Sequence, residues 1–249
     1  MNSRASFVFP PLLALTFMLI AGCSASGELP KPPEHGVSIA LQYAQPANNT
    51  NAIAVLKDVA ARRLDRYGAK GYFEPISTDK LRVTVPTTDP KQIAALTNLL
   101  SLFGVLEFRL VNEGLIPPGK SADDYETLVE NHQGTSIKYL VKKSPELSGS
   151  HIAHAYVSRN PLSNQPEIML KFDEAGKNAF SKTTADNVGR QLAIVLDGKL
   201  MSAPRINEPI RGGSASLSGN FTMQEAINLA NVLEAPFPFS VTTQIEKTF

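Results

Sequence analysis

Apolar and polar residues alternate along the chain with two different periods. Residues 37–43 (VSIALQY) have the two-residue period of a β-strand, whereas apolar residues in 51–67 recur every three or four positions, as on one face of a helix. Two further runs with strand character follow, at 72–78 and 80–86. The first part of the chain is therefore predicted to run strand, helix, strand, strand.

A second helix is predicted after these strands. Asp89 and Pro90 are suited to the N-cap and the first turn, and apolar side chains then recur with helical spacing up to Phe103. Residues 105–111 (VLEFRLV) return to strand character. The resulting order, βαββαβ over 37–113, is the ferredoxin-like split βαβ pattern, so we expect a small layered subdomain here.

The next stretch, 114–238, shows no regular alternation of strands and helices. Asp173 and Thr222 have the residue types and spacing of helix N-caps, and the last run, 239–247, alternates like a strand. Hairpins mixed with helices are typical of an α+β fold, which is the fold class that we predict. Strands within the stretch are predicted at 138–143, 152–158, 167–172, 192–196 and 215–218.

The segment GRQLAIVLDGKLMSAPRI (189–206) predicts a β-hairpin. Its apolar run ends at Asp197 and Gly198, a pair that accommodates the positive φ angles of a two-residue type I′ turn. Because the first strand is apolar on both faces, we expect it in the interior of a sheet. The segment has no nucleophile beside a base, so Asp197 and Gly198 are interpreted as a structural turn.

Composition argues against several classes of function. Of the 249 residues, 43% are hydrophobic and 19% are charged, which suits a globular protein with one large or two small domains. The formal net charge of +1, the lack of Trp and an aromatic content of 7% do not favour nucleic-acid binding. The sequence has no recognisable phosphate loop, so we expect neither a nucleotide nor another cofactor.

The N-terminus indicates export. Arg4 precedes an apolar segment, 7–20, that is short for a membrane span and is typical of a secretory signal. The segment ends in LIAGC, which resembles the bacterial lipobox, and Cys23 would be its lipidated cysteine. Because Cys23 is the only cysteine of the chain, it cannot form an internal disulfide.

We therefore expect residues 1–22 to be a lipoprotein signal peptide. Residues 23–36, rich in Ser, Gly and Pro, would be the lipidated cysteine and a flexible tether. Such a protein would face the periplasm. The lipobox resemblance also implies that Ser24 favours sorting to the outer membrane of a Gram-negative cell. The alternative is an ordinary signal peptide in which Cys23 is incidental.

Several stretches together resemble the first periplasmic domain of the SecD and SecDF protein-export subunits. They are VLEFRLV (105–111), LSGSHI (147–152), the segment 168–206 that contains the hairpin, and SLSGNFTMQEAINLANVLEA (216–235). The resemblance implies a base subdomain made of 37–113, with 239–249 returning to it. It implies an α+β head subdomain made of 114–238.

The chain also departs from that family. No second apolar run of spanning length follows the N-terminal segment, so we do not expect proton-coupled transport. The segment APFPFS (235–240) replaces the Gly-rich connection of the family, so a hinge between base and head is not carried over. Phe237 and Phe239 in this segment are candidate polypeptide contacts, with packing between base and head as the alternative.

Residues with catalytic or metal-binding potential are scattered. His151 and His154 lie three positions apart in a segment of loop and strand character, which places them on opposite faces and short of further ligands. We expect no catalytic residue and no metal site. A solvated helix face, rather than a binding patch, is predicted for four basic residues: Lys57, Arg62, Arg63 and Arg66.

The leading hypothesis is a non-enzymatic, lipid-anchored envelope protein that contacts exported or unfolded polypeptide. An open sheet edge of the base, or an apolar groove between base and head, would bind such chains. The alternative is a structural or regulatory envelope lipoprotein that binds one folded protein partner. A hydrolase on the same scaffold is the third and least favoured hypothesis.

Overall fold

The computed structural model describes most of the chain beyond its N-terminal segment. The predicted signal segment, Cys23 and Phe239 lie outside the described residues. Within the part that is described, no helix is long and apolar enough to cross a membrane. The described residues are 32–43, 51–114, 116, 118–132, 135–219, 221–238 and 240–249.

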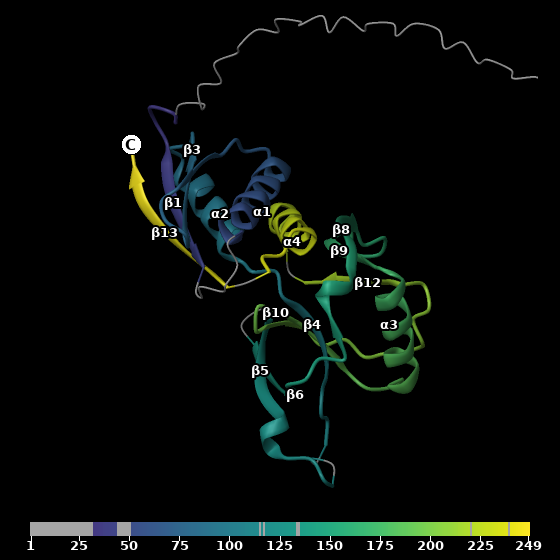
Figure 1. The fold of residues 1–249 in the computed structure, drawn as a ribbon. Helices are drawn as coiled ribbons and strands as arrows, with labels where there is room; N and C mark the ends of the chain where they lie inside the picture. The colour runs from purple at the N-terminus through teal and green to yellow at the C-terminus, as the bar shows by residue number, and fades with distance from the viewer. Residues whose placement is uncertain are drawn as a thin grey trace, which may run out of the picture. The chain divides into compact units, whose positions relative to one another are not determined.

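The first sheet has four antiparallel strands in the order β13-β1-β3-β2, and helices α1 and α2 pack against one of its faces (Figure 1). Ile39 and Leu41 point toward the helices and are fully buried, whereas Gln42 is exposed. One face of the sheet therefore contributes to a core and the other remains open. The elements are β1 (Val37–Tyr43), α1 (Ala52–Tyr67), β2 (Tyr72–Pro75), β3 (Lys80–Val85), α2 (Pro90–Ser101) and β13 (Val241–Thr248).

The fourth strand of this sheet is not the one predicted from the sequence. Strand β3 lies between β1 and β2, as in a split βαβ unit, but β13 pairs with the free side of β1 along its whole length. The prediction that 105–111 closes this sheet is therefore wrong. The reason is that β4 (Leu106–Leu110) pairs with β10 and buries its alternate side chains in a different core.

The second sheet has the order β11-β10-β4-β7. Strand β10 is buried at every residue, in agreement with its unbroken apolar run. It pairs antiparallel with β4 on one side, and on the other it forms the predicted hairpin with β11. The remaining bounds are β7 (Leu147–Ser148), β10 (Leu192–Leu196) and β11 (Lys199–Ser202).

A third sheet, in the order β12-β9-β8, and a separate hairpin, β5–β6, account for the other strands of the described residues. Phe108, Phe172 and Phe180 join the second and third sheets to α3, with ring centroids 4.9 to 5.7 Å apart. The bounds are β5 (Tyr125–His132), β6 (Thr135–Lys142), β8 (Ile152–Arg159), β9 (Pro166–Phe172), α3 (Glu174–Asp186), β12 (Ser214–Ser218) and α4 (Met223–Glu234).

Helix α4 contacts both α1 and the third sheet, and Figure 1 shows it between α1 and strands β8 and β9. Its residues Ala226, Ala230 and Leu233 belong to the core of the second and third sheets. Ala235 and Phe237, which follow the helix directly, belong to the core of the first sheet. The end of α4 is therefore where the chain passes from one core to the other.

The helices begin where the sequence predicts. Asp89, Asp173 and Thr222 each accept a hydrogen bond from a backbone N–H in the first turn of α2, α3 and α4, respectively. Glu225 completes a capping box with Thr222. Strand β5, in contrast, is not among the predicted elements, because its sequence YETLVENH places polar residues on both faces.

Candidate functional site

The turn of the β10–β11 hairpin has an unusual backbone. Asp197 has a φ of 49° and Gly198 a φ of 77°, the two positive values that a type I′ turn requires. The flanking residues Leu196 and Lys199 pair directly across the hairpin. Asp197 tolerates this conformation better than most residues with a side chain, and Gly198 adopts it without strain.

The side chain of Asp197 has a further role that the sequence does not indicate. Its carboxylate accepts hydrogen bonds from the backbone N–H groups of Phe103 (3.0 Å), Gly104 (3.0 Å) and Val105 (2.8 Å). Gly104 has a φ of 86°, and a Cβ there would lie 2.8 Å from the Val232 carbonyl oxygen, so only glycine fits. The turn thereby fixes the segment that leads from α2 into β4.

Arg63 of α1 lies beneath the same segment and is 0% exposed. Its Nε donates to the Ala235 carbonyl at 2.9 Å, and its Nη1 donates to the Leu99 carbonyl at 2.9 Å. Further hydrogen bonds reach the carbonyls of Leu102 and Phe103. One guanidinium therefore binds both chain segments that connect the first sheet with the rest of the protein, and we call this region the junction.

Burial lowers the pKa of the Arg63 guanidinium to about 9, while the negative charge of Asp197 acts in the opposite direction. The guanidinium is therefore still charged at neutral pH. The prediction that Arg63 belongs to a solvated basic face is wrong, because its side chain turns inward to backbone carbonyls. Its neighbours on α1 do reach solvent: Lys57 is exposed, and Arg62 pairs with Asp58 at 2.7 Å.

Phe237 is part of the junction and is 3% exposed. The Arg63 guanidinium lies 4.2 Å from the centre of its ring, and the Phe237 N–H donates to the Phe103 carbonyl at 2.8 Å. An enclosed ring cannot bind a polypeptide, so the structure corrects the expectation of a contact surface at Phe237. The ring instead packs at the junction, which is the alternative role considered for it.

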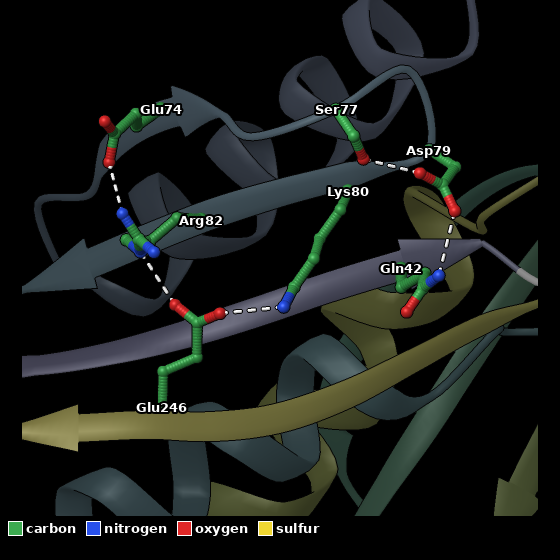
Figure 2. Close-up of polar contacts among 7 residues, drawn as sticks. All are labelled: Gln42, Glu74, Ser77, Asp79, Lys80, Arg82 and Glu246. Atoms are coloured by element: carbon green, nitrogen blue, oxygen red, sulfur yellow. Dashed lines mark hydrogen bonds and ion pairs between the residues drawn. The ribbon is translucent and has the colours of Figure 1, made fainter.

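The open face of the first sheet carries charges that pair with one another (Figure 2). Glu246 binds Lys80 at 2.9 Å and Arg82 at 2.7 Å, and Arg82 also binds Glu74 at 2.7 Å. The hydrogen bond from Lys80, followed by the one from Arg82, lowers the pKa of the Glu246 carboxyl. The two glutamates and two cations thus form one continuous network across three strands.

A second network lies at the other end of this face. Asp79 accepts hydrogen bonds from the Ser77 hydroxyl at 2.5 Å and from the Gln42 amide at 2.8 Å (Figure 2). These bonds, the one from Ser77 first, lower the pKa of Asp79. The face is hollowed next to the Glu246 network by a cavity of about 610 Å³. The charged and polar groups of this face bind one another, which is typical of a solvated surface.

A trough lies between strands β11 and β12. Each is the outermost strand of its sheet, so one side of its backbone is left without a ladder partner among the described residues. Two cavities, of about 610 and 340 Å³, adjoin there and share Glu130 and Ser218 in their walls. We call them together the β11–β12 trough. Its walls include Val129, Glu130, Asn160, Pro166, Glu167, Lys199, Leu200, Met201, Ser202, Ser216, Ser218 and Phe221.

The trough contains two carboxylates. Glu167 of β9 is 9% exposed and accepts a hydrogen bond from the Asn160 amide at 3.3 Å. Glu130 of β5 is half-buried and accepts a hydrogen bond from the Tyr139 hydroxyl, and burial followed by this bond raises the pKa of Tyr139. Neither residue is among the candidates predicted from the sequence. The strand that carries Glu130 was not predicted, and Glu167 lies in a predicted strand whose pattern gives no sign of the cavity beside it.

The two histidines that were considered as ligands have separate carboxylate partners. His151 Nδ1 lies 3.3 Å from Asp173, and His154 Nδ1 lies 3.4 Å from Glu234. Within the described ranges, no group of three or more His, Cys, Asp and Glu side chains is arranged to hold a metal ion. The pair His154–Glu234 therefore connects β8 with α4. The pair His151–Asp173 connects the residue directly before β8 with the start of α3.

Comparison with known proteins identifies relatives of this chain. Residues 125–236 match the family model described as SecDF, P1 head subdomain. Protein translocase subunit SecD of Calditerrivibrio nitroreducens is 34% identical over 205 residues, which cover 74% of this chain and 38% of that relative. The same subunit of Magnetococcus marinus is 36% identical over 189 residues, covering 72% of this chain and 35% of the relative.

Solved structures show the same fold. A crystal structure of SecDF in a super-membrane-facing form has a TM-score of 0.67 at 22% identity, covering 88% of this chain and 32% of that one. A structure of SecDF, described as a membrane component that enhances protein export, has a TM-score of 0.65 at 22% identity, covering 85% and 99%. The α+β fold and the resemblance to the first periplasmic domain of SecD and SecDF are therefore confirmed.

Proposed function

We propose that this protein is a non-enzymatic envelope protein that holds extended polypeptide segments during export or envelope biogenesis. The observation that carries the proposal is the β11–β12 trough, because residues of two edge strands line its adjoining cavities. An extended segment can pair its main chain with such an edge, whatever its side chains are. The site is therefore suited to many different unfolded clients.

The resemblance supports the same function. The relatives from Calditerrivibrio nitroreducens and Magnetococcus marinus are named protein translocase subunits. This chain spans 38% and 35% of their lengths, so the activity of the whole relative is not transferred to it. What the matching residues, 125–236, contribute is the region that forms most walls of the trough. Holding a client requires only that region and no bound nucleotide.

We also propose that a lipid on Cys23 holds the protein at a membrane, facing the periplasm. The support is the LIAGC motif and the solitary cysteine, and Ser24 favours the outer membrane. In the variant Cys23→Ala we expect no palmitate labelling and an unprocessed or mislocalised protein. The wild type should fractionate with membranes. Palmitate labelling that persists in the variant would exclude this anchor.

The holding function is tested with the soluble form that begins at Ser24. We expect it to slow the aggregation of an unfolded client without ATP, and to bind fluorescent unfolded peptides weakly, because ordering a flexible chain opposes binding. Fluorescence anisotropy detects binding down to about millimolar affinity, equivalent to roughly −4 kcal/mol. No binding at that concentration would exclude client holding.

The site is tested by crosslinking, since the soluble form has no cysteine of its own. A photo-crosslinker is attached at Ser216→Cys in the trough or, as the matched control, at Gln244→Cys on the open face of the first sheet. Both positions are exposed. Client crosslinks from position 216 and not from 244 are expected. The reverse result would move the client site to the first sheet.

The alternative is a structural or regulatory lipoprotein with one folded partner, and a specific observation favours it. The open face of the first sheet offers a broad surface of fixed charges, and such surfaces confer specificity for one complementary partner. Crosslinking in intact cells, read by mass spectrometry, separates the two functions. Many unrelated clients support holding, whereas one stoichiometric partner crosslinked from position 244 supports the alternative.

A further inference from the structure

We infer that the β11–β12 trough prefers extended segments that carry a basic side chain, Lys or Arg. This inference rests on the proposed polypeptide-holding function and adds a client class to it. It is based on the balance of charge and apolar surface along the walls of the trough. Three charged residues line the larger cavity: Glu130, Glu167 and Lys199.

Glu167 is the more telling of the two carboxylates. An ionised carboxylate offers about four acceptor positions, and burying it is unfavourable unless these are used. Glu167 is 9% exposed and accepts one long hydrogen bond, 3.3 Å, from the neutral Asn160 amide. Within the described residues, no cation pairs with Glu167. Its remaining acceptor positions are available to a ligand in the cavity.

Glu130 lines the same cavity from strand β5, and its carboxylate is bound by Tyr139, which is neutral. The single cation, Lys199, is exposed and forms no ion pair with the described residues. The lining therefore carries two negative charges against one positive charge that extends into solvent. A cationic head group would be attracted into the cavity, whereas an acidic one would be repelled.

The apolar part of the lining fits the stem of such a side chain. Val129, Leu200, Met201 and Phe221 contribute to the walls of the same cavity. Lys and Arg side chains bury an aliphatic stem against apolar surface and place a charged group at its end. A segment that pairs its main chain along β12 can therefore insert a basic side chain past the apolar residues to the carboxylates.

The test uses three fluorescent peptides of one extended sequence, with Arg, citrulline or Glu at the central position. Citrulline keeps the length and shape of Arg and removes its charge. For the wild-type soluble form we expect the Arg peptide to bind about tenfold more tightly than the citrulline peptide, since a hydrogen bond to a charged group is stronger than one between neutral groups. The Glu peptide should bind most weakly.

The variant Glu167→Gln should reduce the difference between the Arg and citrulline peptides to about twofold or less. Glu130→Gln should reduce it partially, because that residue is less buried. Glu208→Gln is the matched control, since it removes one exposed carboxylate away from the cavity lining and should leave the difference unchanged. Melting temperatures are measured for every variant. If Glu167→Gln does not fold, the basic preference is tested by Glu130→Gln and by the salt dependence of Arg-peptide binding.

The outcomes are distinguishable. Equal affinity for the Arg, citrulline and Glu peptides would overturn the basic preference while leaving polypeptide holding intact. Tighter binding of the Glu peptide would overturn it too and would assign the recognition to Lys199. If none of the peptides binds at about millimolar concentration, the proposed function itself is wrong, and the preference falls with it.

Discussion

The junction and the β11–β12 trough both contain charged side chains that are buried or partly buried, but these charges have different numbers of partners. At the junction, the Arg63 guanidinium donates to four backbone carbonyls, and the Asp197 carboxylate accepts from three backbone N–H groups. In the trough, Glu167 is almost as buried as Arg63 and accepts one hydrogen bond from Asn160. The first arrangement uses most of the donors and acceptors of its two charged groups, and the second leaves most acceptor positions of the carboxylate open.

This difference separates residues that serve the fold from residues that serve binding. A buried charge with all its partners stabilises the one chain arrangement that supplies those partners. A buried charge with few partners destabilises the free protein slightly and recovers that free energy when a complementary ligand enters. The open face of the first sheet is a third case, in which the charges are paired but lie near solvent, so they contribute little to the stability of the fold.

The largest expected effect comes from the junction. In Arg63→Met, four backbone carbonyls lose the hydrogen bond from the guanidinium, and of these the Phe103 carbonyl keeps another donor, the Phe237 N–H. We expect the free energy of unfolding to fall by about 3–5 kcal/mol. Urea unfolding followed by circular dichroism measures this change. Arg62→Met is the matched control, because Arg62 is exposed and, among the residues that the structure describes, forms an ion pair with Asp58 alone. Its substitution should cost less than about 1 kcal/mol. Equal losses for both variants would remove the contrast between junction and surface.

Asp197→Asn gives the next largest effect. Asn tolerates the positive φ of this position, so the variant keeps the turn and tests the carboxylate alone. One oxygen is replaced by an N–H₂ group, which faces backbone donors, and we expect a loss of about 1–2 kcal/mol. Asp186→Asn, on the surface of α3, is the control and should change stability by less than about 0.5 kcal/mol. A loss as small as that of the control would mean that the turn does not hold the α2–β4 segment.

Sequence periodicity predicted those parts of the fold that depend on neighbours along the chain. Helices α1 and α2, strands β1 and β10, and the caps at Asp89, Asp173 and Thr222 all follow from local patterns. Sheet membership is not local. A strand was predicted at 105–111 and is found at 106–110, but its partner is β10, far along the chain. No local signal distinguishes that pairing from closure of the first sheet.

The junction and the trough escaped prediction for the same reason. Arg63 stands among Lys57, Arg62 and Arg66 in the sequence, and its burial depends on the Ala235 carbonyl, 172 residues away. Asp197 was identified as a turn residue, but its hydrogen-bond partners lie 92 to 94 residues away. The trough is built from β5, β9, β11, β12 and the loop between β8 and β9, so its two carboxylates line one cavity only in the folded chain.

A smaller effect is expected on the open face of the first sheet, where pH reveals it. The pKa of Glu246 is lowered in the folded protein by Lys80 and then Arg82. The contribution of this network is therefore fully present above the ordinary pKa of a glutamate, about 4.3, and is lost as pH falls through the lowered value. We expect Glu246→Gln to remove less than about 1 kcal/mol at pH 7, because the network lies near solvent.

As pH falls from about 5 to the lowered pKa of Glu246, the free energy of unfolding should decrease less in Glu246→Gln than in the wild type, because the variant has no carboxylate at position 246 to protonate. Urea unfolding at several pH values measures both curves. Gln244→Ala on the same face is the control, since it removes no charge and should leave the pH dependence unaltered. A pH dependence that is identical in the wild type and in Glu246→Gln would show that the network of Figure 2 does not contribute to stability.

The smallest effect on stability is expected in the trough. Whether the free energy of unfolding rises or falls there is the most direct test of the difference between trough and junction. Gln has the shape of Glu and can still accept the hydrogen bond from Asn160, while it removes a buried charge that lacks a cationic partner within the described residues. We therefore expect Glu167→Gln to leave the free energy of unfolding unchanged or to raise it by up to about 1 kcal/mol. Glu208→Gln should produce no change. A loss above about 1 kcal/mol in Glu167→Gln would show that this carboxylate, like Asp197, serves the fold. The contrast between the well-paired charges of the junction and the poorly paired carboxylate of the trough would then not hold.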